Sequence, residues 1–248
     1  GVCSRRAADD LIRGGRISVN NNLVTELGTR LDPDRDEVRF DEVRVRPERK
    51  VYLLLNKPKG VVCTNARNER RKRAIDFVQD IRGRVYTVGR LDAESEGLIL
   101  LTNDGDLAQA VSHPSRGVPK TYAVLVRGVL SREDFEKARK GIWLSEGRTA
   151  GARISIQRRG RDRTYLKVTI HEGKNREIRR VFARLGYTVL LLKRVRIGDL
   201  TLHGLGAGKF RFLKPREVVE LLALSKGTSG SRGTSGSRGA SRSRGASR

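Results

Sequence analysis

The sequence contains few of the residues that build disulfide frameworks or metal sites. Among 248 residues there are two cysteines, three histidines and no methionine. Cys3 and Cys63 are too few for a disulfide framework and too far apart to form a metal-ligand pair, so we expect both to be reduced thiols. None of His113, His171 and His203 stands in a metal-binding spacing such as HExxH. We expect surface or structural roles for all three histidines.

Long apolar runs and nucleotide-binding motifs are also missing. No segment approaches the roughly 20 apolar residues of a membrane span, and no charged-then-apolar leader opens the sequence. We therefore expect a cytoplasmic protein. There is no Walker A loop, Rossmann glycine fingerprint or serine nucleophile elbow, which disfavours nucleotide hydrolysis and cofactor redox chemistry. The sequence starts at Gly1 without a methionine, and we expect its first module to be incomplete.

Positive charge is abundant. The chain has 53 Lys and Arg against 28 Asp and Glu, a formal net charge of +25. This excess indicates a polyanionic partner, with nucleic acid the first choice and an anionic membrane or heparin-like surface the second.

The last residues, 225–248, repeat Gly, Ser, Thr and Arg and contain no large apolar side chain. Such a segment buries too little surface to offset its ordering entropy, so we expect a disordered basic tail. It could serve as a solubilising extension or as a loose phosphate-binding arm, and the sequence does not decide between them.

Residues 1–45 form a first predicted unit. Ser4 is a plausible N-cap for a helix that ends at Gly14 and Gly15. Alternating Ile17 and Val19 predict a strand, the asparagines at 20–22 a turn with positive φ, and the residues around Leu23 a second strand. The segment 37–45, EVRFDEVRV, predicts one further strand. Residues 46–50 are charged and predict a linker.

Residues 51–224 alternate strand-like runs with a few helical segments. Two helices stand out, at 131–140 with a capping box of Ser131 and Asp134, and at 176–185 before Gly186. Many strands with segregated helices predict an α+β domain built on a largely antiparallel mixed sheet with flanking helices.

Asp92 is the first candidate reactive group, because it ends a loop at the edge of the apolar run GLILLTND. In the helix 176–185, a buried stripe is predicted on one side, and Arg179 borders it. A partly buried guanidinium requires an anionic partner. That pair could be an ordinary ion pair or could keep a reactive carboxylate ionised, and the sequence does not name the carboxylate. Nearby acids have simpler explanations: Glu94 and Glu96 share the Asp92 loop, and Asp104 and Asp106 fit a turn and helix start.

Residues 1–45 resemble the αL RNA-binding motif in SRR, LI and GRISVN. The body resembles the RsuA/RluB-type ribosomal RNA pseudouridine synthases. It contains NKPKGVV from Asn56, GRLDAESEGLILLTNDG from Gly89, HPS and KTYAV, and then GKNREIRRVFARLG followed by LKRVRIG. So many motifs in family order make a strong signal. The resemblance implies isomerisation of a uridine in ribosomal RNA to pseudouridine, weakly favouring the large subunit, by a monomer without a cofactor or metal.

The resemblance also implies residue roles. Asp92 matches the catalytic aspartate, and Tyr122 the tyrosine that packs on the base and is a candidate to remove its C5 proton. Arg179 matches the arginine paired with the catalytic carboxylate. Arg90, Leu91 and Ile178 are implied in the base pocket, with Arg90 filling the space left by a flipped nucleotide. Expected RNA contacts are Arg5, Arg6, Arg13, Arg16, Lys57, Lys120, Lys174, Arg176 and Arg180. A non-catalytic RNA-binding ribosome-assembly factor with the same fold is the alternative.

Overall fold

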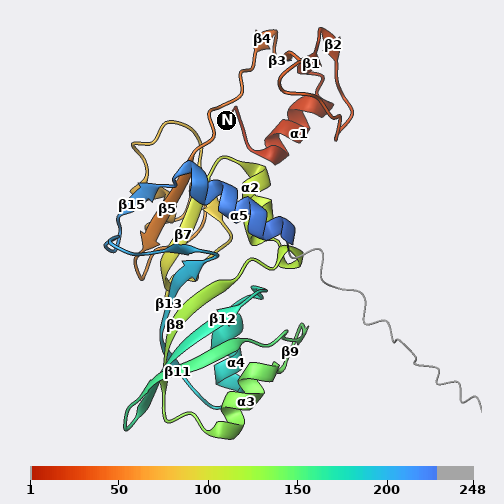
Figure 1. Cartoon of the computed structure of the whole chain (residues 1–248). Helices are drawn as coiled ribbons and strands as arrows, with labels where there is room; N and C mark the ends of the chain where they lie inside the picture. Colours follow the sequence, from red (N-terminus) through yellow and green to blue (C-terminus); the bar gives the residue numbers. More distant parts are fainter. Residues whose placement is uncertain (1, 228–248) are drawn as a thin grey trace, which may run out of the picture.

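The N-terminal module consists of one helix and a small sheet (Figure 1). The computed structural model describes residues 2–227. Ser4 is the N-cap of the helix, its hydroxyl accepting a hydrogen bond from the Ala7 amide at 3.2 Å, and Gly14 is the C-cap. Asn20 and Asn21 have positive φ and connect the first two strands, as the sequence predicts. The elements are α1 (Arg5–Arg13), β1 (Ile17–Val19), β2 (Asn22–Leu23), β3 (Val38–Phe40) and β4 (Val43–Arg44), with strand order β2-β1-β3-β4.

The prediction of one strand over 37–45 is wrong. The segment is a hairpin of β3 and β4, turned at Asp41 and Glu42, whose φ angles are 45° and 63°. Aspartate tolerates this left-handed region better than most residues, and the Asp41 carboxylate is also fixed by an ion pair with Arg16. The alternation of apolar residues on both sides of Asp41 hides the turn in the sequence.

The body is organised around a nine-stranded mixed sheet. Its main path is β11-β12-β8-β13-β7-β5-β15, with β14 beside β13 and β6 beside β7. In the part of the chain that the structure describes, every neighbouring pair of this sheet is antiparallel except β13 and β7. The strands are β5 (Tyr52–Lys57), β6 (Tyr86–Val88), β7 (Glu96–Thr102), β8 (Lys120–Arg127), β11 (Arg153–Arg159), β12 (Arg163–Ile170), β13 (Val189–Ile197), β14 (Leu200–Thr201) and β15 (Phe210–Phe212). A separate hairpin consists of β9 (Trp143–Leu144) and β10 (Gly147–Arg148).

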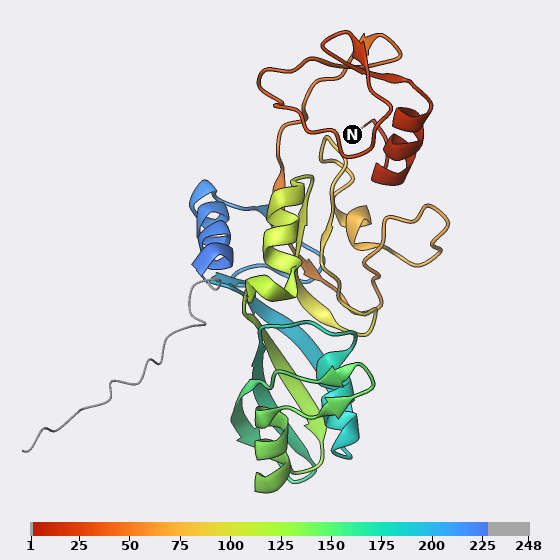
Figure 2. The same cartoon turned by 90° about the vertical axis from the view of Figure 1, so that its right-hand side faces the viewer.

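The helices divide the sheet into two halves (Figures 1 and 2). On the half formed by β8, β11 and β12, two helices pack against one face. On the half formed by β5 and β7, two other helices pack against the opposite face, through Leu107, Val111 and Leu221. The first pair is α3 (Arg132–Lys140) and α4 (Glu177–Arg184), and the second is α2 (Gly105–Ser112) and α5 (Pro215–Gly227). Two short 3-10 turns complete the body, η1 (Ala74–Phe77) and η2 (Pro114–Arg116).

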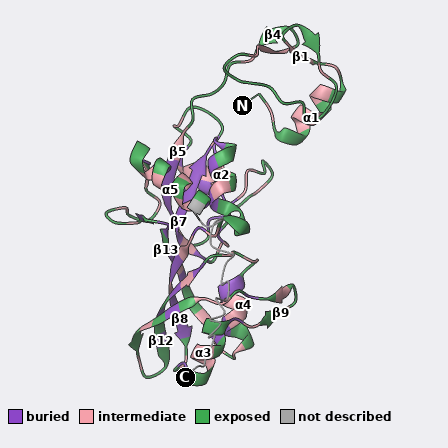
Figure 3. Cartoon of the chain, turned by 45° about the vertical axis from the view of Figure 1, so that its right-hand side comes forward, coloured by how far each residue is buried: buried purple, intermediate pink, exposed green. Residues whose placement is uncertain are grey.

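Burial follows this division (Figure 3). The strands β5 and β7 are buried along nearly their whole length, because their two faces contact different apolar clusters. Strands β11 and β12 alternate between buried and exposed residues over most of their length, as expected for a sheet covered on one face. Gly97 lies where the halves join, at the parallel pairing of β7 with β13.

Two helices, α2 and α5, are not among those that stand out in the sequence. Asp104 caps α2 through its carboxylate, in agreement with the structural role expected for it. Helix α5 was missed, and it runs to Gly227 with Ser225 buried. The predicted tail boundary at 225 is therefore wrong, since residues 225–227 belong to the helix; the rest of the predicted tail lies outside the described residues. No helix within residues 2–227 is long and apolar enough to span a membrane.

Candidate functional site

A cavity opens where the two halves of the sheet meet. Its volume is about 140 Å³, many times the roughly 10–15 Å³ that one water needs. Its walls come from the loop before β7, from β8 and β13, and from the residues that lead into α4. The lining includes Arg90, Leu91, Asp92, Ser95, Lys120, Tyr122, Lys174, Arg176, Glu177, Ile178 and Arg194.

Asp92 forms an ion pair with Arg176 across this cavity. Nη1 of Arg176 lies 3.2 Å from Oδ2 of Asp92, and the carboxylate side chain is 29 % exposed, so it is oriented yet open to solvent. Arg176 occupies the N-cap position of α4 in a left-handed conformation, with φ 47° and ψ 31°. Its second guanidinium nitrogen lies 3.4 Å from Glu94. One arginine thus connects both acids of the loop.

The predicted pairing of Arg179 with Asp92 is wrong. Arg179 donates hydrogen bonds to the backbone carbonyls of Val189 and Glu94, at 3.1 and 3.3 Å, and its ion-pair partner is the Glu94 carboxylate at 4.0 Å. Burial lowers the pKa of Arg179, the charge of Arg176 adds to that shift, and the charges of Glu94 and, less strongly, Asp92 oppose it, although Arg179 forms no ion pair with Asp92. The helical-wheel argument placed Arg179 correctly at the border of the stripe but did not apply to Arg176, because Arg176 precedes the first helical residue.

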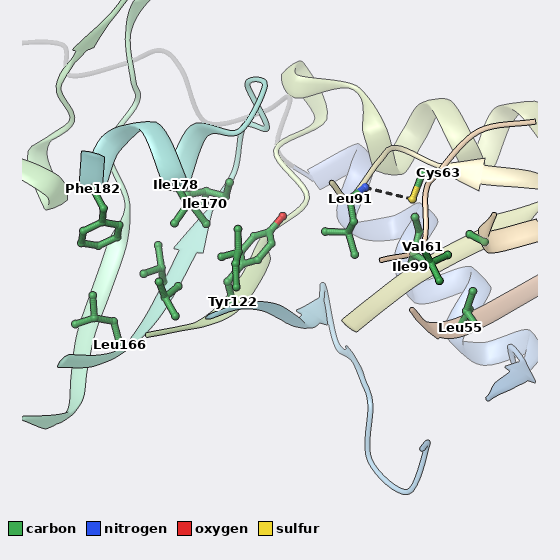
Figure 4. Packing of buried hydrophobic residues seen from close by; sticks show 14 of the residues in the cluster. Leu55, Val61, Cys63, Leu91, Ile99, Tyr122, Leu166, Ile170, Ile178 and Phe182 are labelled. Atoms are coloured by element: carbon green, nitrogen blue, oxygen red, sulfur yellow. Dashed lines mark hydrogen bonds between the residues drawn. The ribbon is translucent and has the colours of Figure 1, made fainter. Parts of the chain in front are cut away.

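The apolar wall of the cavity surrounds Tyr122 (Figure 4). Tyr122 extends from β8, with Ile170 and Ile178 on one side and Leu91 on the other. Tyr122, Leu91 and Ile178 are between 5 and 7 % exposed. The backbone N–H of Leu91 donates to the Cys63 sulfur at 3.4 Å, which fixes the loop that carries Asp92. An apolar wall beside the Asp92 carboxylate suits a planar ring.

The inner wall is polar, and most of its groups were not singled out from the sequence. Burial, followed by the nearby charge of Arg194, lowers the pKa of Lys120 to about 8. Burial and the charge of Glu172 raise the pKa of Glu177 to about 7. Arg194 is buried and donates through Nε to the Leu98 carbonyl at 2.6 Å. Arg194 lies in the LKRVRIG motif, which was the available signal for it.

Two polar atoms in this wall are buried without a hydrogen-bond partner among the described residues. They are Oγ of Ser95 and Nη2 of Arg194. Buried polar groups are usually satisfied, and both residues line the cavity. A ligand with acceptor atoms would provide the missing partners. No group of three or more His, Cys, Asp or Glu within residues 2–227 is arranged to hold a metal ion.

The arginines of the N-terminal module that were expected to contact RNA differ in how far their side chains are exposed and paired. Arg5, Arg6 and Arg13 are exposed on α1, and Arg13 also pairs with Asp10 at 3.3 Å. Arg16 is half-exposed but engaged by the carboxylate of Asp41.

Lys57 cannot make the RNA contact expected of it. It is fully buried, and its ammonium donates to the carbonyls of Pro58 and Val61 at 3.0 and 2.7 Å. The prediction for Lys57 is therefore wrong, because β5 lies inside the sheet and directs this side chain into the interior.

The remaining cations lie around the cavity mouth. Arg90 is exposed at the rim. Lys174 lines the cavity and donates to the Arg148 carbonyl at 2.6 Å. Arg180 faces away from the cavity and forms an ion pair with Glu146. The structure thus brings Arg90, Leu91, Asp92, Lys120, Tyr122, Lys174, Arg176 and Ile178 together around one cavity and leaves out Arg179, Arg180, Lys57 and the arginines of α1 and Arg16.

Comparison with known proteins gives matches along most of the chain. The family model "RNA pseudouridylate synthase" matches residues 51–184, and the model "S4 domain" matches residues 1–38. A Bacillus subtilis protein named ribosomal large subunit pseudouridine synthase B is 41 % identical over 228 residues, covering 91 % of this chain and 93 % of the relative. An uncharacterised RNA pseudouridine synthase of Aquifex aeolicus is 39 % identical, with 89 % of each covered. A crystal structure of a pseudouridylate synthase superimposes with a TM-score of 0.66 at 29 % identity, covering 88 % of this chain and 94 % of that one.

Proposed function

Because the chain belongs to the RNA pseudouridylate synthase family, we propose that it converts a uridine of large-subunit ribosomal RNA to pseudouridine. The name of the Bacillus subtilis relative supports the choice of subunit. We include a monomeric state and a cytoplasmic location in the proposal. The single observation that carries it is the ion pair of the Asp92 carboxylate with Arg176 in a cavity that Tyr122 also lines.

The reaction is an isomerisation, so no atom is gained or lost overall. The bond between uracil N1 and ribose C1′ breaks, the base rotates, and C5 bonds to C1′ while its proton moves to N1 with the help of a base and solvent. Asp92 acts as an anion, either by attacking C1′ or by removing the 2′ proton. In both routes Arg176 orients the carboxylate and keeps its charge balanced in the partly closed site.

In this proposal Tyr122 holds the uracil ring by stacking and accepts the C5 proton. Its ring lies in an apolar wall with Leu91 and Ile178, and an aromatic ring in such a wall suits contact with a planar base. The ring carbonyls and N3–H of uracil would then meet the polar inner wall, where Oγ of Ser95 and Nη2 of Arg194 have no hydrogen-bond partner among the described residues. These groups distinguish a pyrimidine from a purely apolar ring.

Base flipping is required, since the reacting atoms of a stacked uridine are not accessible. Extrusion costs a few kcal/mol, and contacts with backbone phosphates offset that cost. In this proposal Arg90, which is exposed at the rim, fills the vacated space, and the exposed arginines of α1 add contacts to the RNA.

The proposal is tested with ribosomal RNA transcribed from uridine tritiated at C5. The protein should release tritium as pseudouridine forms. Asp92→Asn should abolish release while RNA binding stays within about twofold, because the substitution keeps the side-chain shape. Asp106→Asn is the matched control: Asp106 is exposed in the first turn of α2 and lines no part of the cavity, so its release should be normal. Tight RNA binding without any release by the unaltered protein would refute the enzyme and favour an assembly factor.

A further inference from the structure

One face of the sheet lies open on the half formed by β11, β12, β8 and β13. Helices α3 and α4 cover the other face of this half (Figures 1 and 2), and within residues 2–227 only the end of α5, at Leu224, reaches the open one. Strand neighbours point to opposite faces, so the residues next to Tyr122 and Leu166 on their strands belong to the open face. We call it the open sheet face and define it by Arg153, Arg158, Tyr165, Lys167, Lys193 and Arg196.

The strand register sets these side chains in rows. Arg153 pairs with Thr169 of β12, which pairs with Thr121 of β8, which pairs with Arg196 of β13. In the next row Lys167 lies between Ser155 and Ala123, and Ala123 pairs with Lys193. The first row therefore has a cation at each end, Arg153 and Arg196, and the second has Lys167 in the middle and Lys193 at one end.

A groove crosses these rows. It is lined by Arg153, Lys167 and Arg196, by the carboxylate of Asp199, by the hydroxyls of Thr121, Thr169 and Ser155, and by Leu224 near the end of α5. Within the described residues, neither Arg153 nor Lys167 has a carboxylate within 4.0 Å, whereas Arg196 is paired with Asp199 at 2.5 Å. Guanidinium, ammonium and hydroxyl groups are the side chains that most often contact phosphate oxygens. The groove thus presents two uncompensated cations beside several hydrogen-bond donors.

An aromatic ring continues the surface beyond the groove. Tyr165 is 38 % exposed, and the guanidinium of Arg158 lies 5.9 Å from its ring centre. In the same row Leu191, paired with Leu125 of β8, is 39 % exposed. A basic sheet face with one exposed aromatic ring suits RNA, since the ring offers a stacking platform for a base and the cations follow the backbone.

Other occupants fit less well. A second copy of this chain would bring another basic surface against this one, and the chain as a whole carries a charge of +25. An anionic membrane would meet a sheet face with few large apolar groups to insert. An acidic protein could neutralise the cations but would make no particular use of the exposed ring.

We propose that the open sheet face is a second RNA-binding surface, separate from the cavity that contains Asp92. RNA phosphates bind at Arg153 and Lys167, and a base stacks on Tyr165. The two surfaces lie on opposite faces of the same strands, since Lys120 and Ile197 line the cavity while Thr121 and Arg196 line the groove. The RNA bound there is a stretch other than the one that delivers the target uridine. The RNA class rests on the proposed function, although binding itself requires no turnover.

The test measures RNA binding in the Asp92→Asn background, so that catalysis plays no part. The affinity for large-subunit ribosomal RNA is measured against salt concentration for the double variant R153Q/K167Q. The matched control is R132Q/K140Q, which removes two exposed cations from α3 on the opposite face. Thermal melting confirms that each variant is folded.

Loss of two phosphate contacts should reduce the slope of log K against log salt by about 1.4–1.8 and the affinity at 0.1 M salt roughly tenfold or more. The α3 variant should change both much less. Equal effects of the two variants would overturn the proposal, because only total charge would then matter.

A second pair of variants separates RNA from other polyanions. Tyr165→Ala should weaken RNA binding about fivefold or more, Tyr165→Phe should not, and polyglutamate binding should be the same for both. Unchanged RNA affinity in Tyr165→Ala would refute the assignment to RNA. Failure of the unaltered protein to form pseudouridine would overturn the proposed activity and leave these binding results standing.

Discussion

Nη1 of Arg176 lies 3.2 Å from the Asp92 carboxylate, although Arg176 stands outside the helix that follows it. The left-handed backbone at this one residue turns its side chain from the helix start into the cavity. The cation that faces the reactive acid is thus positioned by a backbone conformation and not by a helical face.

Arg176→Gln should lower the rate of tritium release about fivefold or more, because an ion pair with a partly exposed carboxylate contributes up to roughly 1 kcal/mol. Arg176→Lys should recover part of the rate, since it keeps the charge. Arg184→Gln, an exposed change on α4, serves as control. Single-turnover kinetics with saturating enzyme separates this loss from weaker RNA binding. A normal rate in Arg176→Gln would show that the ion pair is structural only.

Lys120 should make RNA affinity sensitive to pH just above neutrality. Burial, and then the charge of Arg194, lower the pKa of Lys120 to about 8, so the ammonium is mostly charged at pH 7 and mostly neutral at pH 9. If it contacts a phosphate, affinity should fall about tenfold over that range. Lys120→Arg should remove the pH dependence, because a guanidinium stays charged. Fluorescence anisotropy with labelled RNA at pH 7, 8 and 9 measures the difference, and an equal decline in both proteins would argue against the contact.

Glu177 should reduce stability as pH rises. Burial and the charge of Glu172 raise its pKa to about 7, above the ordinary value of 4.5, so the folded state holds a proton that the unfolded state has already lost. The free energy of unfolding therefore declines between about pH 4.5 and pH 7 and stays low above it. Glu177→Gln should be more stable than the parent by about 3 kcal/mol at pH 8 and by about 1 kcal/mol or less at pH 5.

Urea unfolding at the two pH values tests this expectation. Glu133→Gln, an exposed change on α3, is the control and should show no such difference. A stability gain of the same size at pH 5 and pH 8 would mean that the carboxyl of Glu177 does not titrate in this interval.

Gly97 should not tolerate a side chain. Its φ is 104°, and a Cβ there would lie 2.2 Å from the backbone oxygen of Arg194, where β7 meets β13. Gly97→Ala should lower the free energy of unfolding by about 3 kcal/mol and Tm by roughly 6–12 °C. Gly173→Ala meets no atom within 4 Å and should change Tm little. Calorimetry on both variants measures the contrast; similar melting temperatures would show that the two strands separate easily.

The sequence predicted much of the chemistry but not all of its geometry. Asp92, Tyr122 and Ile178 were placed together because their motifs have a fixed order, and the cavity does contain all three. Arg179 was assigned the partner role by resemblance and by its helical position, and neither argument could register the left-handed backbone at Arg176. That conformation is rare outside glycine and leaves no mark in the pattern of apolar residues.

Burial was the other property that the sequence did not reveal. Lys57 reads as an exposed cation in NKPKG, yet β5 is covered on both faces and the ammonium finds two backbone carbonyls. The sequence does not predict helix α5, whose apolar residues do not stand out as a single helical stripe. It does not predict the turn at Asp41 either, because apolar and polar residues keep alternating from β3 into β4. The open sheet face depends on strand register across four segments, which only the folded chain brings together.

The acid and the aromatic ring of the cavity belong to different halves of the sheet: Asp92 precedes β7, and Tyr122 lies on β8. Within residues 2–227, strands β13 and β7 are paired at two positions, Lys193 with Glu96 and Arg194 with Gly97. The spacing between carboxylate and ring therefore depends on this short pairing, in which Arg194 also lies opposite Tyr122 of β8. Substitutions at these paired residues would change the distance between Asp92 and Tyr122, and with it the reaction rate, while leaving both reacting side chains unaltered.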